Sequence, residues 1–148
     1  MRTMFDDGVR REMIGRIRSL RPDSARRWGR MSAPQMIVHL TDQMSHTLGD
    51  HPVAPMKGPL RFPFVGHIVI YWLPWPKGRV KGPPEAFVTK PAEWKSDVDR
   101  LEKMLERLAA RDPDGAWPEH AKFGKISGRD WGCFCYRHFD HHLRQFGA

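Results

Sequence analysis

The sequence predicts an all-α protein, a four-helix bundle with a long connection between its second and third helices. Three observations lead to this prediction. Four segments carry apolar residues at the three- and four-residue spacing of a helix face. No segment shows a convincing alternation of apolar and polar residues, as a half-buried strand would. The 148 residues, 40% of them hydrophobic, suit a single domain over residues 1–148 with its own core.

The first helix is expected to carry its apolar face across residues 9–20 and to end at a turn that contains Pro22. Its apolar face consists of Val9, Met13, Ile17 and Leu20. Four arginines lie off this line and are expected to face solvent, namely Arg10, Arg11, Arg16 and Arg18.

The second helix is expected to begin after Ser32, because Gln35 three residues later completes a capping box. Met36, Leu40 and Met44 continue as an apolar stripe, and Gly49 ends the helix. Two histidines belong to the same helix. His39 lies one residue round from the stripe, and His46 follows two turns later.

Residues 50–90 form a long connection that holds eight of the thirteen prolines. It carries one short apolar element at residues 65–72. Residues 62–76 contain no Lys, Arg, Asp or Glu, but they are shorter than the roughly 20 residues of a membrane span. The segment is therefore expected to be a buried short helix or a lid, and long connections of this kind often shape functional sites.

The third helix is expected over residues 91–111 and the fourth over residues 127–146. The third has a bundle-type seam of apolar residues, namely Trp94, Val98, Leu101, Leu105 and Leu108. In the fourth, Ser127 and Asp130 form a second capping box. Its inward face is expected to carry Trp131, Cys135, His138, His142 and Gln145.

The formal net charge of +8 is spread along the chain and has no run of five basic residues. Nine basic and four acidic residues fall in residues 1–30, whereas five basic and eight acidic residues fall in residues 91–120. Nucleic-acid binding is therefore disfavoured.

The two cysteines, Cys133 and Cys135, exclude a disulfide scaffold and favour a reducing compartment. The first residues contain no apolar signal segment, so we expect a cytoplasmic protein without membrane contact.

The histidines are the best candidates for chemistry. His138 and His142 are four residues apart on one predicted helix, which places both imidazoles on one face within reach of one ion. His39 offers a third nitrogen from another core helix. Three histidine ligands leave a fourth position open for water or substrate, as catalytic metal sites do.

The other histidines and nearby polar residues can be interpreted as ordinary structural residues as well as functional ones. His141 points away from His142 and is expected at the surface or beside the ligands, and Asp140 and Gln145 either orient the imidazoles or are ordinary polar residues. His46 is a weak candidate for a general base. Three histidines in loops are expected to be ordinary polar residues, namely His51, His67 and His120.

Several motifs together resemble the DinB/YfiT-like metalloenzyme superfamily, in a branch known mainly as a domain of unknown function. They are Trp28-Gly29-Arg30-Met31-Ser32, Gln35-Met36 with His39, Pro74 to Gly78, His120-x-x-Phe123-Gly124, Ser127-x-x-x-Trp131, and the run from Arg137 to Gly147. The resemblance covers nearly the whole chain. One departure is Ala121, where the family has proline after the histidine.

This resemblance implies a DinB-like four-helix bundle, often paired as a homodimer. It also implies a divalent metal, zinc or nickel, bound by His39, His138 and His142. Related members include thiol transferases and suspected hydrolases, so the leading hypothesis is a metal-dependent enzyme that acts on a small molecule, such as a thiol. The alternative is a non-catalytic module, stress-associated or binding a small ligand, and a third hypothesis is nucleic-acid binding through the basic first helix.

Overall fold

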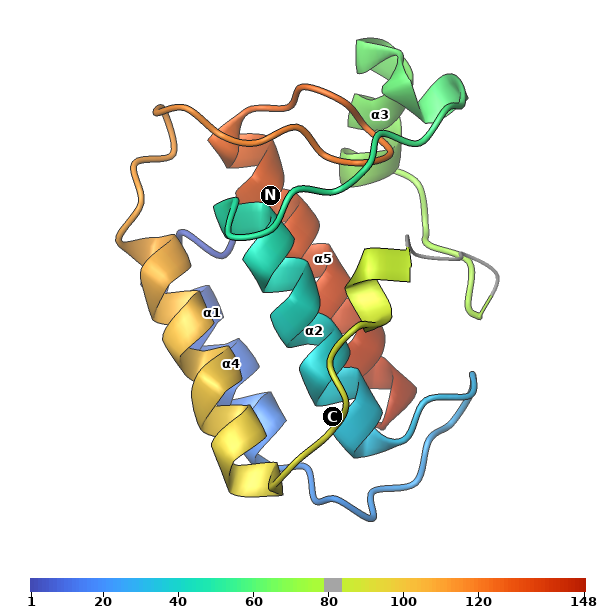
Figure 1. Cartoon of the computed structure of the whole chain (residues 1–148), viewed down its shortest axis with the longest axis vertical. Coiled ribbons are helices and arrows are strands. Elements are labelled where there is room, and N and C mark those ends of the chain that lie inside the picture. The colour runs from blue at the N-terminus through green and yellow to red at the C-terminus, as the bar shows by residue number, and fades with distance from the viewer. Residues whose placement is uncertain (79–83) are drawn as a thin grey trace.

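The computed structural model describes residues 1–78 and 84–148, and within them the chain is all-helical with no strand (Figure 1). There are five α-helices in the described residues, and two short 3₁₀ turns precede and follow α3. The helices are α1 (Asp7–Arg18), α2 (Ala33–Leu48), α3 (Pro63–Tyr71), α4 (Trp94–Ala109) and α5 (Gly128–Gln145). The 3₁₀ turns are η1 (Pro59–Arg61) and η2 (Pro84–Phe87).

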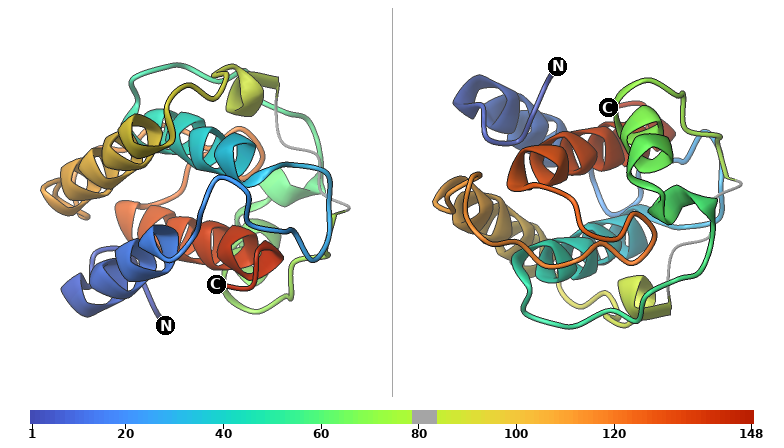
Figure 2. Two further views of the ribbon diagram at one scale, coloured as in Figure 1. Left: turned by 90° about the horizontal axis from the view of Figure 1, so that it is seen from below. Right: turned by 90° about the horizontal axis from the view of Figure 1, so that it is seen from above.

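The four long helices pack side by side, and each of α1 and α2 contacts both α4 and α5. Helix α3 and the residues around it lie on the side of α2 and α5 that faces away from α1 and α4 (Figure 2). The core between the long helices is built from the apolar faces predicted above, together with Phe139 and Leu143 of α5, which were not on the predicted inward face. Its fully buried side chains include Met13, Ile17, Met36, Leu40, Met44, Leu101, Leu105, Trp131, Phe139 and Leu143.

Both predicted capping boxes are confirmed. The hydroxyl of Ser32 accepts from the amide of Gln35 at 3.3 Å, and the Gln35 side chain accepts from the amide of Ser32 at 2.9 Å. Ser127 and Asp130 make the equivalent pair at 3.1 and 3.0 Å. These contacts satisfy backbone donors that the first turn leaves free, so α2 and α5 begin where the sequence indicates.

The first and third predicted helices differ from the structure at their ends. Helix α1 begins at Asp7, two residues before the first residue of its predicted apolar face, because the carboxylate of Asp6 caps it by accepting from the amide of Val9 at 3.1 Å. Helix α4 begins at Trp94 rather than at residue 91, because Glu93 accepts from the amides of Lys95 and Ser96 and acts as its cap. The side-chain acceptors, not the apolar periodicity, set these two boundaries.

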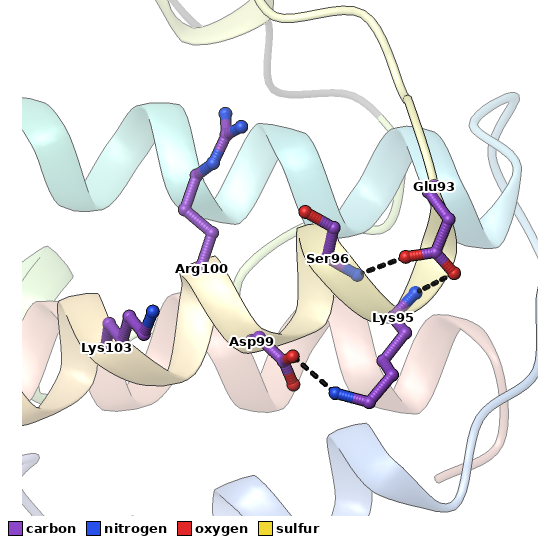
Figure 3. Close-up of a pocket in the computed structure, with 6 residues that line it drawn as sticks. All are labelled: Glu93, Lys95, Ser96, Asp99, Arg100 and Lys103. Carbon is purple, nitrogen blue, oxygen red and sulfur yellow. Dashed lines mark hydrogen bonds and ion pairs between the residues drawn. The ribbon is translucent and has the colours of Figure 1, made fainter.

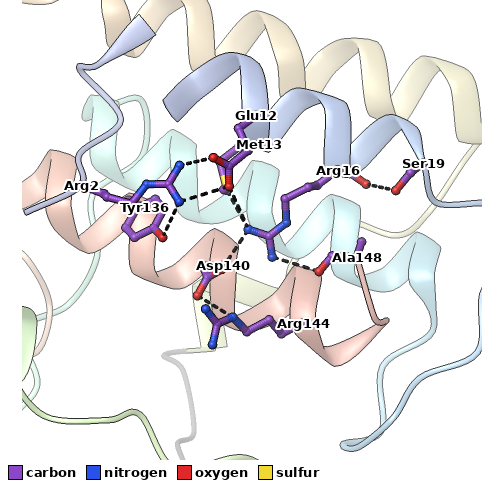
Figure 4. Close-up of polar contacts among 9 residues, drawn as sticks. All are labelled: Arg2, Glu12, Met13, Arg16, Ser19, Tyr136, Asp140, Arg144 and Ala148. Atoms are coloured by element: carbon purple, nitrogen blue, oxygen red, sulfur yellow. Dashed lines mark hydrogen bonds and ion pairs between the residues drawn. The ribbon is translucent and has the colours of Figure 1, made fainter. Parts of the chain in front are cut away.

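The arginines of α1 are not all solvated, contrary to the prediction. The side chains of Arg10 and Arg16 are mostly buried. Arg16 contacts Asp140 of α5 at 2.9 Å and the carbonyl of Ala148 at 3.0 Å (Figure 4). Arg2 pairs with Glu12 in the same network. Arg16 thus ties α1 to α5, and Arg18 pairs with Glu102 of α4, which weakens the case for a nucleic-acid surface here.

Helix α3 confirms the short element predicted within the long connection. Of the two forms expected, a buried short helix or a lid, the fully buried helix is not found. Phe62, Phe64 and Trp72 are 68%, 77% and 78% exposed, whereas Ile70 is buried. Arg137 of α5 donates to the carbonyls of Val69 and Ile70 at 3.0 and 2.8 Å. Arg137 therefore fixes α3 to α5, while Phe64 and the two flanking residues Phe62 and Trp72 stay exposed. Within the described residues, no helix has the length and apolar character to cross a membrane.

Candidate metal centre

The three histidines predicted as ligands lie together between α2 and α5. The Nε2 atoms of His39 and His138 are 3.2 Å apart, and those of His138 and His142 are 3.0 Å apart. One nitrogen from each of the three residues lies within 4.8 Å of the other two. The residues are only 4%, 8% and 9% exposed, respectively. Two helices that are far apart in sequence thus bring three imidazoles to one buried point.

The geometry of the cluster suits a metal ion better than a hydrogen-bond network. Each ring nitrogen carries one in-plane lone pair or one N–H, so Nε2 of His138 cannot make good hydrogen bonds to both neighbouring Nε2 atoms. Two nitrogens bound to one tetrahedral zinc ion at about 2.0–2.1 Å would lie about 3.3 Å apart. The observed separations are close to this value, so the donor set fits a divalent cation.

Gln145 fixes the orientation of one candidate ligand. Its amide nitrogen donates to the carbonyl of Trp28 at 2.8 Å, and a carbonyl only accepts, so the amide oxygen must face the other way. That oxygen lies 3.1 Å from Nδ1 of His142, which therefore carries the proton. Nε2 of His142 is then left with its lone pair, the form that binds a metal.

The turn before α2 leaves room for this amide. Gly29 has a positive φ of 77°, and a side chain there would collide with the amide nitrogen of Gln145. Of the two orienting residues considered from sequence, Gln145 contacts a candidate ligand. Asp140 instead pairs with Arg16 and Arg144 at 2.9 Å each, so its suggested orienting role is not supported.

Aromatic rings pack against the imidazoles. The ring of Phe87 stacks on His39 with centroids 4.6 Å apart and planes inclined by 11°, and Phe134 stacks on His138 at 5.6 Å. Trp75 lies 6.0 Å from His138. These rings shield the cluster from water and lower the local dielectric, which strengthens binding of a cation by neutral nitrogens.

Asp42, one turn after His39, holds the segment that carries Phe87. Its carboxylate accepts from the backbone amides of Val88 and Thr89 at 3.0 Å each and from the Thr89 hydroxyl. Neither Asp42 nor Phe87 was identified from the sequence. The spacing of Asp42 from His39 places both on one side of α2, but no pattern indicates that residues 87–89 return to this helix.

The electrostatics of the cluster favour neutral imidazoles. Burial, followed by repulsion from His142 and His39, holds the pKa of His138 well below its ordinary value. Burial and the nearby His39 lower the pKa of His142 to about 3, although the Gln145 contact opposes this. Only the deprotonated ring nitrogen binds a metal, so the site presents the competent form at neutral pH.

The other candidate histidines stay outside the cluster. His141 packs edge-on against Trp28 at 5.9 Å and lies 6.2 Å from Trp75, and burial lowers its pKa. His46 is buried farther along α2. His120 is buried in the turn before α5 and accepts from two backbone amides, so it is not the ordinary polar loop residue that was expected.

A shallow hollow on the outer side of α4 offers no competing site (Figure 3). Glu93 accepts from the backbone amides of Lys95 and Ser96, and the Lys95 ammonium pairs with Asp99 at 2.6 Å. These exposed groups cap the helix and pair with residues one turn away, as on an ordinary solvated helix face.

The fold and the cluster together define an all-helical protein with a buried three-histidine site that could hold a metal ion. The chain belongs to the family described as "Protein of unknown function (DUF1569)", whose model matches residues 4–148. Comparison with curated proteins gave no match, and neither did comparison with solved structures.

Proposed function

We propose that this protein is a metal-dependent enzyme of the hydrolase or thiol-transferase type. His39, His138 and His142 would hold one divalent ion, zinc or nickel. The observation that carries the proposal is the convergence of three buried Nε2 atoms at separations of 3.0 and 3.2 Å. A metal with three histidine ligands keeps a position for water or a small thiol and lowers the pKa of that molecule toward neutrality.

The residues around the cluster would support this chemistry. Gln145 keeps the lone pair of His142 Nε2 directed into the cluster through its contact with Nδ1. Phe87 and Trp75 limit the access of bulk water. A dry and rigid surrounding of this kind raises both metal affinity and the electrostatic effect of the ion.

The resemblance described above supports the finer points of the proposal. These are a DinB-like four-helix bundle formed as one domain by residues 1–148, a homodimer, a cytoplasmic location and a small-molecule substrate such as a thiol. The exposed aromatic residues in and beside α3, Phe64 and Trp72 among them, are compatible with a protein contact.

A non-catalytic module, stress-associated or holding a small ligand at the metal, is the second candidate. The aromatic contacts favour it, because Phe87, Phe134 and Trp75 supply neither an acid nor a base to a bound molecule. Turnover separates the two candidates. Hydrolysis or transfer with simple esters or thiol conjugates that is lost in His138→Ala would exclude the non-catalytic module.

Metal analysis tests the proposal directly. Protein purified without a histidine tag should contain one divalent ion per chain, as measured by inductively coupled plasma mass spectrometry. His39→Ala and His138→Ala should lose the ion while keeping the helical circular dichroism spectrum. His67→Ala is the matched control, because its side chain is exposed on α3. Less than about a tenth of an equivalent, with no uptake of added zinc or nickel, would overturn the proposal.

A further inference from the structure

Helix α3 is apolar on two opposite sides, and only one of them is covered. Gly66 and Ile70, four residues apart, are buried and form the side that faces the protein. By helical spacing, Phe64 and the capping residue Trp72 lie on the opposite side, 77% and 78% exposed, with the half-buried Ile68 between them. Among the described elements, η1 and α5 pack against α3, which lies at the edge of the molecule (Figure 1).

Contacts on the covered side fix which residues of α3 face outward. A side chain at Gly66 would lie 2.9 Å from the carbonyl oxygen of Leu60, so the helix packs closely against η1 at this point. Toward its other end, the guanidinium of Arg137 in α5 donates to the carbonyls of Val69 and Ile70 at 3.0 and 2.8 Å. A rotation of α3 about its axis would break these contacts. The outward aromatic residues are thus held in solvent.

The chain on either side of α3 extends this apolar surface. Phe62 before the helix is 68% exposed, and Leu73 after it is 48% exposed. Of the eight large hydrophobic residues that are exposed in the described chain, five fall within residues 56–73. Single exposed apolar residues are ordinary, but a concentration in one segment marks an interaction surface. The α3 surface consists of Met56, Phe62, Phe64, Trp72 and Leu73.

Basic residues accompany the α3 surface. Residues 51–78 contain three basic residues and no Asp or Glu. The turn at residues 119–125 lies against η1, because the carbonyl of Ala121 accepts from Arg61 at 3.2 Å and from the amide of Met56 at 2.8 Å. This turn adds two further lysines. The basic residues of the two segments are Lys57, Arg61, Lys77, Lys122 and Lys125.

Two acidic residues contact α3 or η1, and both are engaged. The carboxylate of Glu119 pairs with Arg61 at 3.1 Å. The carboxylate of Asp130 accepts from the hydroxyl of Tyr71 at 2.7 Å and from the amide of Ser127 at 3.0 Å, and its side chain is only 18% exposed. The charge that accompanies the α3 surface is therefore positive.

We propose that the α3 surface docks on an anionic phospholipid bilayer. Phenylalanine and tryptophan side chains suit the boundary between headgroups and acyl chains, and the neighbouring lysines suit the lipid phosphates. The nine residues of α3 extend about 14 Å, so the helix would lie in the interface and not cross the bilayer. The sequence-based expectation of no membrane contact rests on segment length and on signal segments, whereas a shallow contact needs neither.

A second copy of the chain suits the α3 surface less well. In a two-fold symmetric dimer the same residues face each other, so the basic residues of one copy would approach those of the other. A bilayer instead offers an apolar boundary and negative charge together. The proposed homodimer would then use another face. The inference goes beyond the proposed function and does not depend on metal binding.

Sedimentation with sucrose-loaded vesicles tests the inference on the full chain. The protein should bind vesicles of equimolar phosphatidylcholine and phosphatidylglycerol at least about tenfold more tightly than vesicles of phosphatidylcholine alone, because each basic group near an anionic surface adds to binding. Added salt should weaken this binding by screening. Absence of binding to the anionic vesicles, or equal binding to both kinds, would overturn the inference.

A double variant identifies the surface responsible. Phe64→Ser together with Trp72→Ser should weaken binding to the mixed vesicles at least about tenfold, because two exposed aromatic side chains no longer enter the interface. Its circular dichroism spectrum should be unchanged. Val88→Ser is the matched control, since Val88 is 70% exposed and lies outside the α3 surface. A double variant that binds like the unaltered protein would contradict docking through α3.

Two further measurements report what covers the surface. Brominated lipids in the mixed vesicles should quench the fluorescence of the bound protein, and Trp72→Phe should remove most of this quenching while it keeps the binding. Quenching that persists in Trp72→Phe would show that another part of the molecule enters the bilayer. Sedimentation velocity without lipid examines the second copy. A dimer that the double variant converts to a monomer would assign the surface to self-association and overturn the inference.

Discussion

Nδ1 of His142 lies 3.1 Å from the amide oxygen of Gln145, one turn later on α5, and the amide nitrogen of Gln145 donates to the carbonyl of Trp28. This chain of contacts links the turn before α2 to the three-histidine cluster. It leaves the His142 ring one protonation state in which Nε2 can bind a cation. The strength of metal binding should therefore depend on a residue that does not touch the metal.

Gln145→Leu should weaken metal binding by about 10- to 100-fold, because the variant loses the acceptor that orients His142. The measurement is competition with a chromophoric chelator at neutral pH. Arg144→Ala is the control, since its exposed guanidinium pairs with Asp140 and not with the cluster. An unchanged affinity in Gln145→Leu would show that the contact does not tune the ligand.

Phe87 should control how fast the metal leaves. Its ring covers one side of His39 at 4.6 Å, and Asp42 holds the neighbouring backbone in place. Phe87→Ala should accelerate metal removal by excess chelator several-fold and leave the stoichiometry at one ion per chain, because no ligand is removed. Stopped-flow fluorescence or absorbance follows the release.

Val88→Ala provides the matched control for that experiment. Val88 is the next residue and its side chain is 70% exposed, whereas its backbone amide, which the substitution keeps, donates to Asp42. Equal release rates for Phe87→Ala, Val88→Ala and the unaltered protein would show that the stacked ring does not limit exchange.

The parts of the fold that depend on local interactions could be predicted from the sequence. Ser32 with Gln35 and Ser127 with Asp130 form hydrogen bonds within a single turn, so the residue types alone identify the starts of two helices. The spacing of His138 and His142 likewise fixes their common side of α5. The position of His39 followed from the apolar stripe of α2, since a bundle turns neighbouring sides of its helices inward.

Contacts between distant segments could not be predicted in this way. The contact between Phe87 and His39 depends on the path of a proline-rich connection that has no periodicity. The exposure of Phe64 on α3 depends on which other segments pack against that helix. The burial of His120 was missed for a different reason. Two backbone amides satisfy its Nδ1 within a turn that the sequence marks only by His120, Phe123 and Gly124.

The buried His120 should make stability depend on pH. Its pKa is about 3 in the folded chain and about 6.5 when unfolded, so the unfolded chain binds a proton first as the pH falls. Its contribution is complete above pH 6.5 and is lost between pH 6.5 and 3. From pH 7 to pH 5 this amounts to at most about 2 kcal/mol.

Urea unfolding at the two pH values checks this expectation. His120→Asn keeps an acceptor for the backbone amides but cannot titrate, so its free energy of unfolding should fall less between pH 7 and pH 5. His67→Asn removes an exposed histidine and should follow the unaltered protein. Identical pH dependence in all three proteins would contradict a neutral, buried His120.

Two glycines at helix positions should respond to alanine in opposite directions. Gly15 is exposed on α1 and an added methyl group meets no atom within 4 Å, so Gly15→Ala should stabilise the fold by about 0.5–1 kcal/mol through helix propensity.

Gly132 is buried on α5, and a methyl group there would lie 2.6 Å from Cδ2 of Phe5. Phe5 cannot easily retreat, because the amide of Met4 donates to the carbonyl of Gly132 at 3.1 Å. Gly132→Ala should therefore destabilise the fold by about 1–3 kcal/mol. Urea unfolding measures both variants. If Gly132→Ala stabilised the fold as much as Gly15→Ala, the N-terminal residues would not pack on α5.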